Sequence, residues 1–188
     1  MNISAGRGSE YGVGVGRVPA FDPAKPRNPV QRATRWVAKT GFGGWVALNV
    51  ANKVDPYLMR ASRGLLKVPS GAPTVLLTHT GAKSGRRRTT PLVYFTDGDN
   101  VILIASQTGK PKHPAWFHNL SANPEIELWA RGRGGDYRAR EAEGGERERL
   151  WKQATQLYPG YDDYQRRADA AGRRIPVVVC EPRDGVGA

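Results

Sequence analysis

From Thr74 onward the chain alternates short apolar runs with turn residues, and this pattern predicts six β-strands. The runs are rich in Val, Ile, Leu and Thr and are bounded by Gly, Pro, Asn or Asp, as is usual for strands. They cover residues 74–80, 91–96, 101–106, 126–131, 137–141 and 175–180. Hairpin turns are expected at residues 97–100 and 132–135, so the sheet should be largely antiparallel. Six such strands are enough for a small barrel.

Helical patterns interrupt these strands in three places. The first covers residues 114–122 and ends at an Asn-Pro pair, and the third covers residues 162–171. The second covers residues 145–157 and gathers its apolar side chains on one face, namely Leu150, Trp151, Ala154 and Leu157. The main domain is therefore expected to span residues 71–188 and to mix strands with flanking helices.

The first 70 residues lack the strand pattern and divide into two parts. Residues 1–27 are rich in Gly, Pro and Arg without a hydrophobic period, which is typical of a mobile tail. Residues 28–70 carry helical patterns, and the first helix sets Trp36 and its apolar neighbours opposite a stripe of Arg32, Arg35 and Lys39. Such a basic amphipathic segment can pack on the main domain, or residues 28–60 can contact an anionic membrane peripherally. Both interpretations stay open.

The charge of the chain favours an anionic partner without choosing one. Lys and Arg number 29 against 17 Asp and Glu, a net charge of +12 at pH 7. Nucleic acid is disfavoured, because the basic stretch at residues 81–90 lacks interleaved aromatic residues for base stacking. The only cysteine is Cys180, which excludes an intrachain disulfide and a cysteine-based zinc site and favours a reducing cytoplasm. No secretory signal or membrane-spanning stretch is expected.

Residues 76–94, LLTHTGAKSGRRRTTPLVY, form the most informative segment of the chain. An apolar run enters, a basic loop punctuated by glycine follows, and a second apolar run leaves. Between Gly81 and Thr90 there is no acidic residue, and the cations are Lys83, Arg86, Arg87 and Arg88. Cationic side chains, hydroxyl groups and free backbone N–H groups together can hold phosphate or carboxylate. Charge alone equally allows a solvated hairpin tip.

Common catalytic motifs are missing from the sequence. It contains no Walker A sequence, no HExxH and no GxSxG, so nucleotide hydrolysis and a hydrolytic triad lack support. The three histidines, without cysteine partners, make a poor metal set, and no metal is expected.

Four strings follow the basic loop in a fixed order, and they identify a family. They are IAS at residues 104–106, HPAWFHNL at 113–120, YPGYDDY at 158–164 and IPVVVCEP at 175–182. Together with TGAKSGRRRTTPL, they closely resemble the deazaflavin-dependent nitroreductases, an actinobacterial family that uses coenzyme F420. The resemblance covers roughly residues 75–182. It implies an α+β split β-barrel, like that of FMN-binding oxidoreductases, with about six mainly antiparallel strands and flanking helices.

The resemblance also implies an activity and a cofactor site. Reduced coenzyme F420 would give a hydride to a quinone or a nitro compound, and its anionic tail of phosphate and glutamyl carboxylates would lie on the basic loop. Matching positions on the loop and the strand after it are Ala82, Lys83, Ser84, Arg88, Thr89, Thr90, Pro91, Leu92 and Val93. Matching positions nearer the ring are Ile104, Ala105, Ser106, Gln107, Ala115, Trp116, Phe117, His118, Asn119 and Tyr161.

The protein's share of the chemistry is orientation of the reactants and a path for a proton. The candidates are Ser106, Tyr158, Tyr161 and Tyr164. Arg86 and Arg87 lie where the family varies and are expected only to raise the local positive field. Trp116 can instead be a core residue, and the tyrosine run can be a helix connection with buried aromatics.

Three alternatives remain at this stage. The chain can be a non-catalytic binder of coenzyme F420, or a reductase of the same fold that uses FMN, because both cofactors offer a flat ring and phosphate. The third concerns the acceptor. Val93 stands where the family's nitroimidazole-activating member has tyrosine, and Tyr94 is expected on the other strand face. A quinone is therefore the preferred acceptor, and the oligomeric state is left open.

Overall fold

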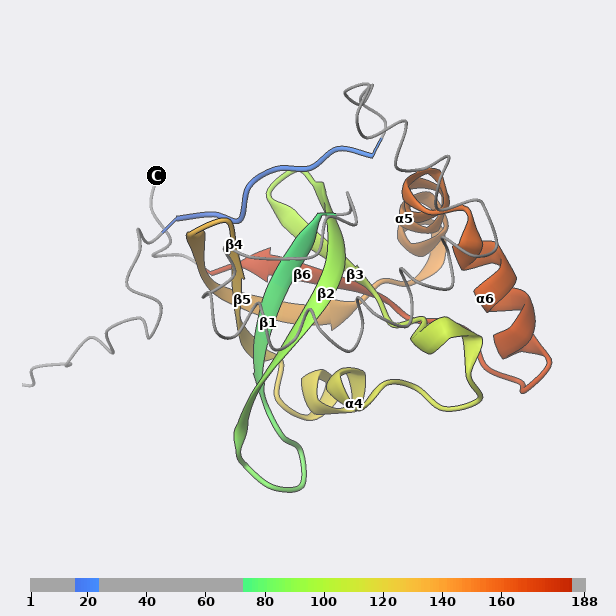
Figure 1. Ribbon diagram of the computed structural model, residues 1–188, viewed down its shortest axis with the longest axis horizontal. Coiled ribbons are helices and arrows are strands. Elements are labelled where there is room, and N and C mark those ends of the chain that lie inside the picture. The colour runs from blue at the N-terminus through green and yellow to red at the C-terminus, as the bar shows by residue number, and fades with distance from the viewer. Residues whose placement is uncertain (1–15, 24–72, 184–188) are drawn as a thin grey trace, which may run out of the picture.

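The computed structural model describes residues 16–23 and 73–183, and its centre is a closed barrel of six antiparallel strands (Figure 1). Around the barrel the strands follow the order β1-β2-β3-β6-β5-β4, and β4 pairs back onto β1. Their bounds are β1 Thr74–Thr80, β2 Arg87–Asp97, β3 Asn100–Ile104, β4 Glu125–Ala130, β5 Arg133–Glu141 and β6 Val177–Pro182. The predicted split β-barrel is confirmed.

Within the described residues, three α-helices lie outside the barrel wall, each at a place where the sequence predicted one. They are α4 Ala115–Ala122, α5 Gly144–Leu157 and α6 Gly160–Asp169, and a short 3₁₀ turn, η2, covers Gln107–Gly109. In Figure 1, α4 lies below the barrel beside the β1–β2 hairpin, whereas α5 and α6 flank its right side. The hairpin tip and α4 therefore lie at one end of the barrel, whereas α6 lies at its side.

The barrel wall separates two apolar layers, because successive strand residues point to opposite faces. On β3, Val101 and Leu103 point into the barrel, and Ile102 and Ile104 point outward beneath α5 and α6. The outer layer also takes Phe95, Leu150, Ala154, Tyr161, Tyr164, Ile175 and Val179. The helices that carry the tyrosine cluster are thus fixed to the wall by a packed core.

Strand β2 begins four residues earlier than the sequence predicted, and this lengthens the hairpin. Its first residues are polar and lack the apolar pattern, yet Arg87 pairs with Thr80 and Thr90 pairs with Leu77. Backbone pairing with β1 continues beyond the barrel because it needs no apolar side chains. The basic loop is consequently held on a protruding two-stranded arm.

The turn between β4 and β5 lies earlier than the predicted turn at residues 132–135. Arg131 and Gly132 form it, both with left-handed backbone (φ 51° and 75°), and Ala130 pairs with Arg133. A two-residue turn with two positive φ angles matches the twist of a hairpin. Gly134 therefore belongs to β5, where a Cβ atom would lie 2.0 Å from the carbonyl oxygen of Leu128.

Residues 16–23 lie along the barrel and are held there by hydrogen bonds. The Tyr94 hydroxyl donates to the carbonyl of Pro19 (2.9 Å), and the N–H of Val18 donates to the Tyr137 hydroxyl (3.0 Å). Val18 packs among the interior residues. The sequence predicted a mobile tail over residues 1–27, so this part of it is corrected. The other residues of that tail and the basic segment 28–70 lie outside the described residues.

Membrane insertion by a helix has no support in the part of the chain that the structure describes. Within residues 16–23 and 73–183, no helix combines the length and apolar character needed to cross a bilayer.

The tight approach at Gly134 predicts opposite effects for two glycine substitutions. Gly134→Ala forces the β4 backbone to move and should lower the free energy of unfolding by about 1–3 kcal/mol, as overpacking usually does. Gly145→Ala is the control, because its Cβ would meet open space near the start of α5, and it should leave stability unchanged or raise it by up to about 1 kcal/mol. Urea unfolding checks both values, and equal stability of the two variants would contradict the packing argument.

Candidate functional site

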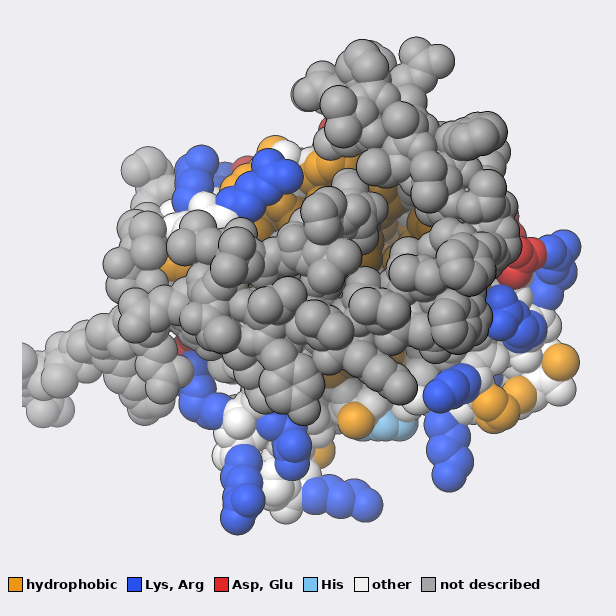
Figure 2. All heavy atoms as spheres, viewed as in Figure 1, with side chains coloured by type: hydrophobic (Ala, Val, Ile, Leu, Met, Phe, Trp, Pro, Cys, Tyr) orange, Lys and Arg blue, Asp and Glu red, His pale blue; other side chains and the backbone are white. Residues whose placement is uncertain are grey.

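The basic loop closes on itself at the tip of the β1–β2 arm. The N–H of Gly81 donates to the carbonyl of Arg86, and the N–H of Gly85 donates to the carbonyl of Gly81, each at 2.9 Å. Gly85 has a left-handed backbone (φ 62°). Figure 2 shows Lys and Arg side chains projecting from this end of the molecule into solvent. The tip is therefore a closed turn surrounded by cations.

Adjacent arginines in this arm have different environments, because their side chains leave β2 on opposite faces. Arg87 donates to Glu127 of β4 at 2.7 Å and is neutralised there. Arg88 lies opposite His79 of β1 in register. Like Lys83 and Arg86, Arg88 is exposed and forms no ion pair with any described residue. Three cations of the loop thus remain available for an anion.

One asparagine ties the loop to α4. The N–H of Ala82 donates to Asn119 Oδ1 at 2.9 Å, and Asn119 Nδ2 lies 3.2 Å from His79 Nδ1. Because the amide nitrogen can only donate, His79 Nδ1 accepts, and its Nε2–H donates to Thr90 Oγ1 at 3.3 Å. Burial, with a smaller effect from the Arg88 charge, lowers the pKa of His79 and favours this neutral form. The Thr90 hydroxyl proton is then free to point at a ligand.

A strained turn follows β3 at the predicted ring side of the site. Gln107, Thr108 and Gly109 all have positive φ angles of 45°, 55° and 78°. Left-handed backbone is unfavourable for a β-branched residue such as Thr108, and such strain tends to persist at functional sites. Gly109 packs against α6, where a Cβ atom would lie 2.6 Å from the carbonyl oxygen of Tyr164. The turn is therefore fixed in place directly after Ser106.

Arg173 makes hydrogen bonds to the backbone at the start of this turn. Its Nη2 donates to the carbonyl of Ser106 at 2.7 Å, and its Nη1 donates to the carbonyl of Ala105 and to His113 Nδ1, both at 3.2 Å. Only 5% of the residue is exposed, and it pairs with no described carboxylate. Burial lowers the pKa of Arg173. Burial, and then the charge of Arg173, lower the pKa of His113. One side chain thus joins β3, the segment before α4 and the segment before β6.

The three predicted tyrosines form a cluster on and beside α6. Their ring centroids lie 5.4–6.2 Å apart, and the hydroxyls of Tyr158 and Tyr164 are 3.3 Å apart. Tyr158 is 42% exposed, whereas Tyr161 and Tyr164 are buried. Burial raises the pKa of both buried phenols, so they stay protonated and can donate. Tyr158 is the member of the cluster that offers a phenol to solvent.

The other predicted residues lie at various depths. Ile104, Ala105 and Trp116 are buried, and Trp116 packs in the barrel interior. Thr89 bonds Thr78 at 3.3 Å, on the strand face opposite Thr90. Leu92, Pro91 and Phe117 are partly buried. Exposed positions are Ala82, Ser84, Val93, Gln107, Ala115 and His118.

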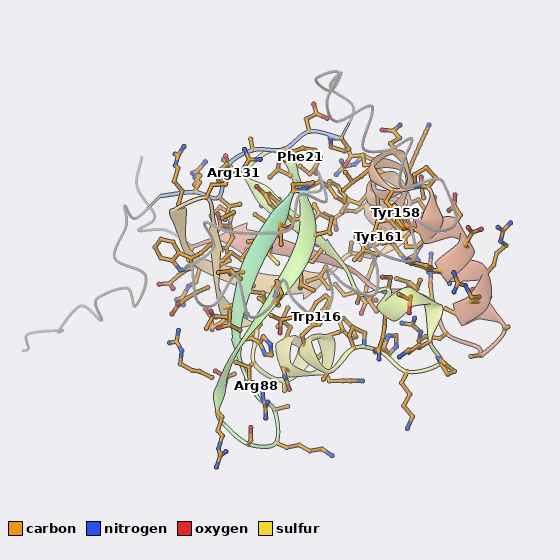
Figure 3. All side chains as sticks on the ribbon, viewed as in Figure 1. Phe21, Arg88, Trp116, Arg131, Tyr158 and Tyr161 are labelled. Atoms are coloured by element: carbon orange, nitrogen blue, oxygen red, sulfur yellow. The ribbon has the colours of Figure 1, made fainter. Side chains whose placement is uncertain are left out.

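The loop and the tyrosine cluster are linked through α4 and not by direct contact. Asn119 at one side of α4 bonds the loop, and His113 before the helix bonds Arg173. In the view of Figure 3, Trp116 lies between Arg88 and the tyrosines. The predicted residues thus form two groups on either side of α4, one cationic and one phenolic.

Sequence reasoning missed two residues of this arrangement, His79 and Arg173. His79 could have been found from strand alternation, since it shares the inner face of the arm with Thr90. Arg173 lies in a loop 67 residues after Ser106, and no periodic pattern marks it. Among the described residues, no group of His, Cys, Asp or Glu could hold a metal ion.

Comparison with known proteins gives this arrangement a family. Residues 45–182 match the family model described as F420H(2)-dependent quinone reductase. A Mycobacterium tuberculosis protein described as a candidate F420H(2)-dependent quinone reductase is 37% identical over 125 residues, which are 66% of this chain and all of that protein.

Two solved structures are similar to this chain. One, described as an F420-H2 dependent reductase, is 43% identical with a TM-score of 0.51, covering 58% of this chain and 94% of its own. Another, described as a domain-swapped dimer, is 37% identical with a TM-score of 0.55, covering 73% of this chain and 98% of its own. The matched family model spans most of the chain, so the protein belongs to the F420H(2)-dependent quinone reductase family.

Proposed function

We propose that the protein transfers a hydride from reduced coenzyme F420 to a quinone. The observation that carries this proposal is the closed loop with exposed Lys83, Arg86 and Arg88, none of which pairs with a described residue, in a chain of this family. The cofactor tail carries phosphate and several carboxylates, so it needs several cations along one path. A loop without acidic residues fits that tail by the chemistry of its donors.

The loop is suited to hold the cofactor tail because a hydrogen bond to Asn119 of α4 fixes its backbone. Asn119 occupies the N–H of Ala82 and leaves the loop's side chains directed outward. Neutral His79 orients the Thr90 hydroxyl without adding a buried charge. Thr90 and Arg88 lie on the same strand face and can therefore contact one ligand together. Binding is then a matter of cations and hydroxyls on a rigid arm.

The ring side would supply orientation and a proton. When bound, the reduced deazaflavin supplies the hydride, and the acceptor needs a proton as its charge develops. Tyr158 is exposed and hydrogen-bonded to the protonated Tyr164, so the pair can pass a proton from solvent to an acceptor oxygen. Ser106 lies at the start of the strained turn and can orient the acceptor. Arg173 places a fixed positive charge behind Ser106.

The residues at positions 93 and 94 of β2 favour a quinone over a nitroimidazole as the hydride acceptor. Val93 is 36% exposed on one face of the strand. The side chain of Tyr94 points to the other face and is buried in the barrel, where its hydroxyl donates to the carbonyl of Pro19. No phenol is therefore supplied by this part of β2 to a substrate, in contrast to the nitroimidazole-activating pattern.

Turnover with a simple quinone tests the proposed activity. Reduced coenzyme F420 mixed with menadione and the protein should regain the absorbance of the oxidised deazaflavin at a rate proportional to protein concentration. Tight binding of the cofactor with no turnover on any quinone or nitroarene would identify a non-catalytic binder instead.

Three single substitutions in the arm separate tail binding from net charge. Lys83→Ala and Arg88→Ala should each weaken coenzyme F420 binding by about ten- to a hundredfold, since each removes one charge-assisted contact worth about 1.5–3 kcal/mol. Arg87→Ala removes the same charge but one already paired with Glu127, so it should change affinity less than about threefold. Fluorescence titration of the cofactor measures all three. An equal loss in all three variants would mean that only the general field matters.

Removing the exposed phenol should affect chemistry and not binding. Tyr158→Phe breaks the hydroxyl pair with Tyr164, so kcat for quinone reduction should fall by about tenfold or more while the affinity for coenzyme F420 stays the same. Steady-state kinetics and a cofactor titration on the same preparation measure the two effects. Unchanged kcat in Tyr158→Phe would rule out the phenol relay, and a matching drop in affinity would place Tyr158 in cofactor binding.

A further inference from the structure

A cationic cavity lies between α5, α6 and the loop that leads into β6. Its volume is about 400 Å³, within the range of small-molecule sites. The lining residues that matter are Arg147, Trp151, Gln165, Asp169, Arg173 and Arg174. None of the predicted cofactor-binding residues lines it. We call it the Arg147 pocket.

The Arg147 pocket has more positive than negative charge. Three arginines line it against one carboxylate, Asp169, whose Oδ1 already accepts from Gln165 at 2.7 Å. Arg174 is exposed and has no hydrogen bond or ion pair with a described residue. The pocket therefore has a cation at its rim that is free to bind.

Arg147 gives the pocket a buried, incompletely bonded cation. Only 8% of it is exposed, and its guanidinium makes one hydrogen bond, from Nη2 to the carbonyl of Ile175 at 3.1 Å. Its Nε has no partner among the described residues. Burial and then repulsion from Arg174 lower its pKa, whereas Glu141, Glu148 and Asp169 act in the opposite direction. An anion between the two guanidinium groups would relieve this repulsion.

The walls of the pocket are formed before any ligand arrives. The Gln165 amide donates to Asp169 and to the carbonyl of Arg173 (3.2 Å), and its oxygen accepts from the N–H of Ile175 (3.0 Å). The guanidinium of Arg147 stacks over the Trp151 ring at 5.3 Å. A site whose residues are already fixed loses little conformational entropy on binding.

We propose that the Arg147 pocket binds a small oxyanion, a phosphate or carboxylate group, at a site separate from the anion loop. Arg147 and Arg174 hold the anion from two sides, and Trp151 gives an apolar wall to whatever group carries it. Arg173 lines the same pocket and also bonds Ser106, so an occupant acts on the ring side of the proposed cofactor site. That effect on turnover rests on the proposed function, whereas the binding itself does not.

The test uses inorganic phosphate and the indole N–H signal of Trp151 in ¹H–¹⁵N NMR, with no cofactor present. Trp151→Phe assigns the signal, and sodium chloride at matched ionic strength corrects for salt. Phosphate should shift the signal saturably in the wild type and in Lys83→Ala. Arg174→Ala should weaken this binding at least tenfold, whereas Arg166→Ala, which removes an equal charge from α6 outside the pocket lining, should not.

Two results would overturn the proposal. The first is a shift in the wild type that never saturates or equals that caused by chloride. The second is an equal response in Arg174→Ala and Arg166→Ala, which would mean that phosphate senses only net charge. Because Arg174 is exposed, its variant is expected to fold, and the dispersion of the same spectra verifies this. A failure of quinone reduction would leave the binding result unaffected.

Discussion

The ring side of the proposed cofactor site depends on the hydrogen bonds that the buried guanidinium of Arg173 makes. A buried charge is costly unless its hydrogen-bonding groups are satisfied, and here no described carboxylate compensates it. The chain instead supplies two carbonyl oxygens from the end of β3 and one imidazole nitrogen from the segment before α4. Arg173 lies 60 to 68 residues after these acceptors, and its Nε has no partner among the described residues. The hydrogen bonds of its two Nη atoms therefore fix the connection between β3 and α4 relative to the loop before β6.

The strained turn at residues 107–109 is a consequence of the same constraint. Three successive left-handed residues would not persist in an isolated peptide. Arg173 restrains the turn at Ser106, and α6 restrains it at Gly109, where only a hydrogen fits against the Tyr164 carbonyl. This turn therefore joins Ser106 to α6, the helix that carries Tyr161 and Tyr164. Strain, buried charge and tyrosine cluster thus form one structural unit.

The anion loop is organised by simpler physics, and the sequence predicted more of it. Glycine punctuation, a lack of acidic residues and flanking apolar runs were enough to place a basic turn between two strands, and alternation separates Arg87 from Arg88. The barrel itself followed from short apolar runs and hairpin turns. Its closure pairs β1 with β4 and β3 with β6, which are far apart in sequence, and the family resemblance supplied that part of the prediction.

Long-range polar contacts were beyond reach of the sequence. Arg173 looks like any loop arginine until the fold brings Ser106 to it, and His79 gains its role only when Asn119 arrives from α4. The segment at residues 16–23 looks like a tail because its anchors, Tyr94 and Tyr137, lie 75 and 119 residues away from the groups that they bond. The β4–β5 turn was misplaced because three of residues 132–135 are glycines, and the packing of Gly134 against β4 favours the observed register. In each case a contact between distant residues outweighs the local pattern.

The central claim is that the arm recognises the anionic tail while the Arg173 unit accommodates the ring. The most direct measurement is a binding titration of the wild-type protein with three ligands: coenzyme F420, the same deazaflavin without its phosphate–glutamate tail, and FMN. We predict that coenzyme F420 binds at least tenfold more tightly than either of the other two, and that its advantage declines as salt is added, since the loop cations are exposed. Equal affinity for the tail-less deazaflavin, or tighter binding of FMN, would contradict the account.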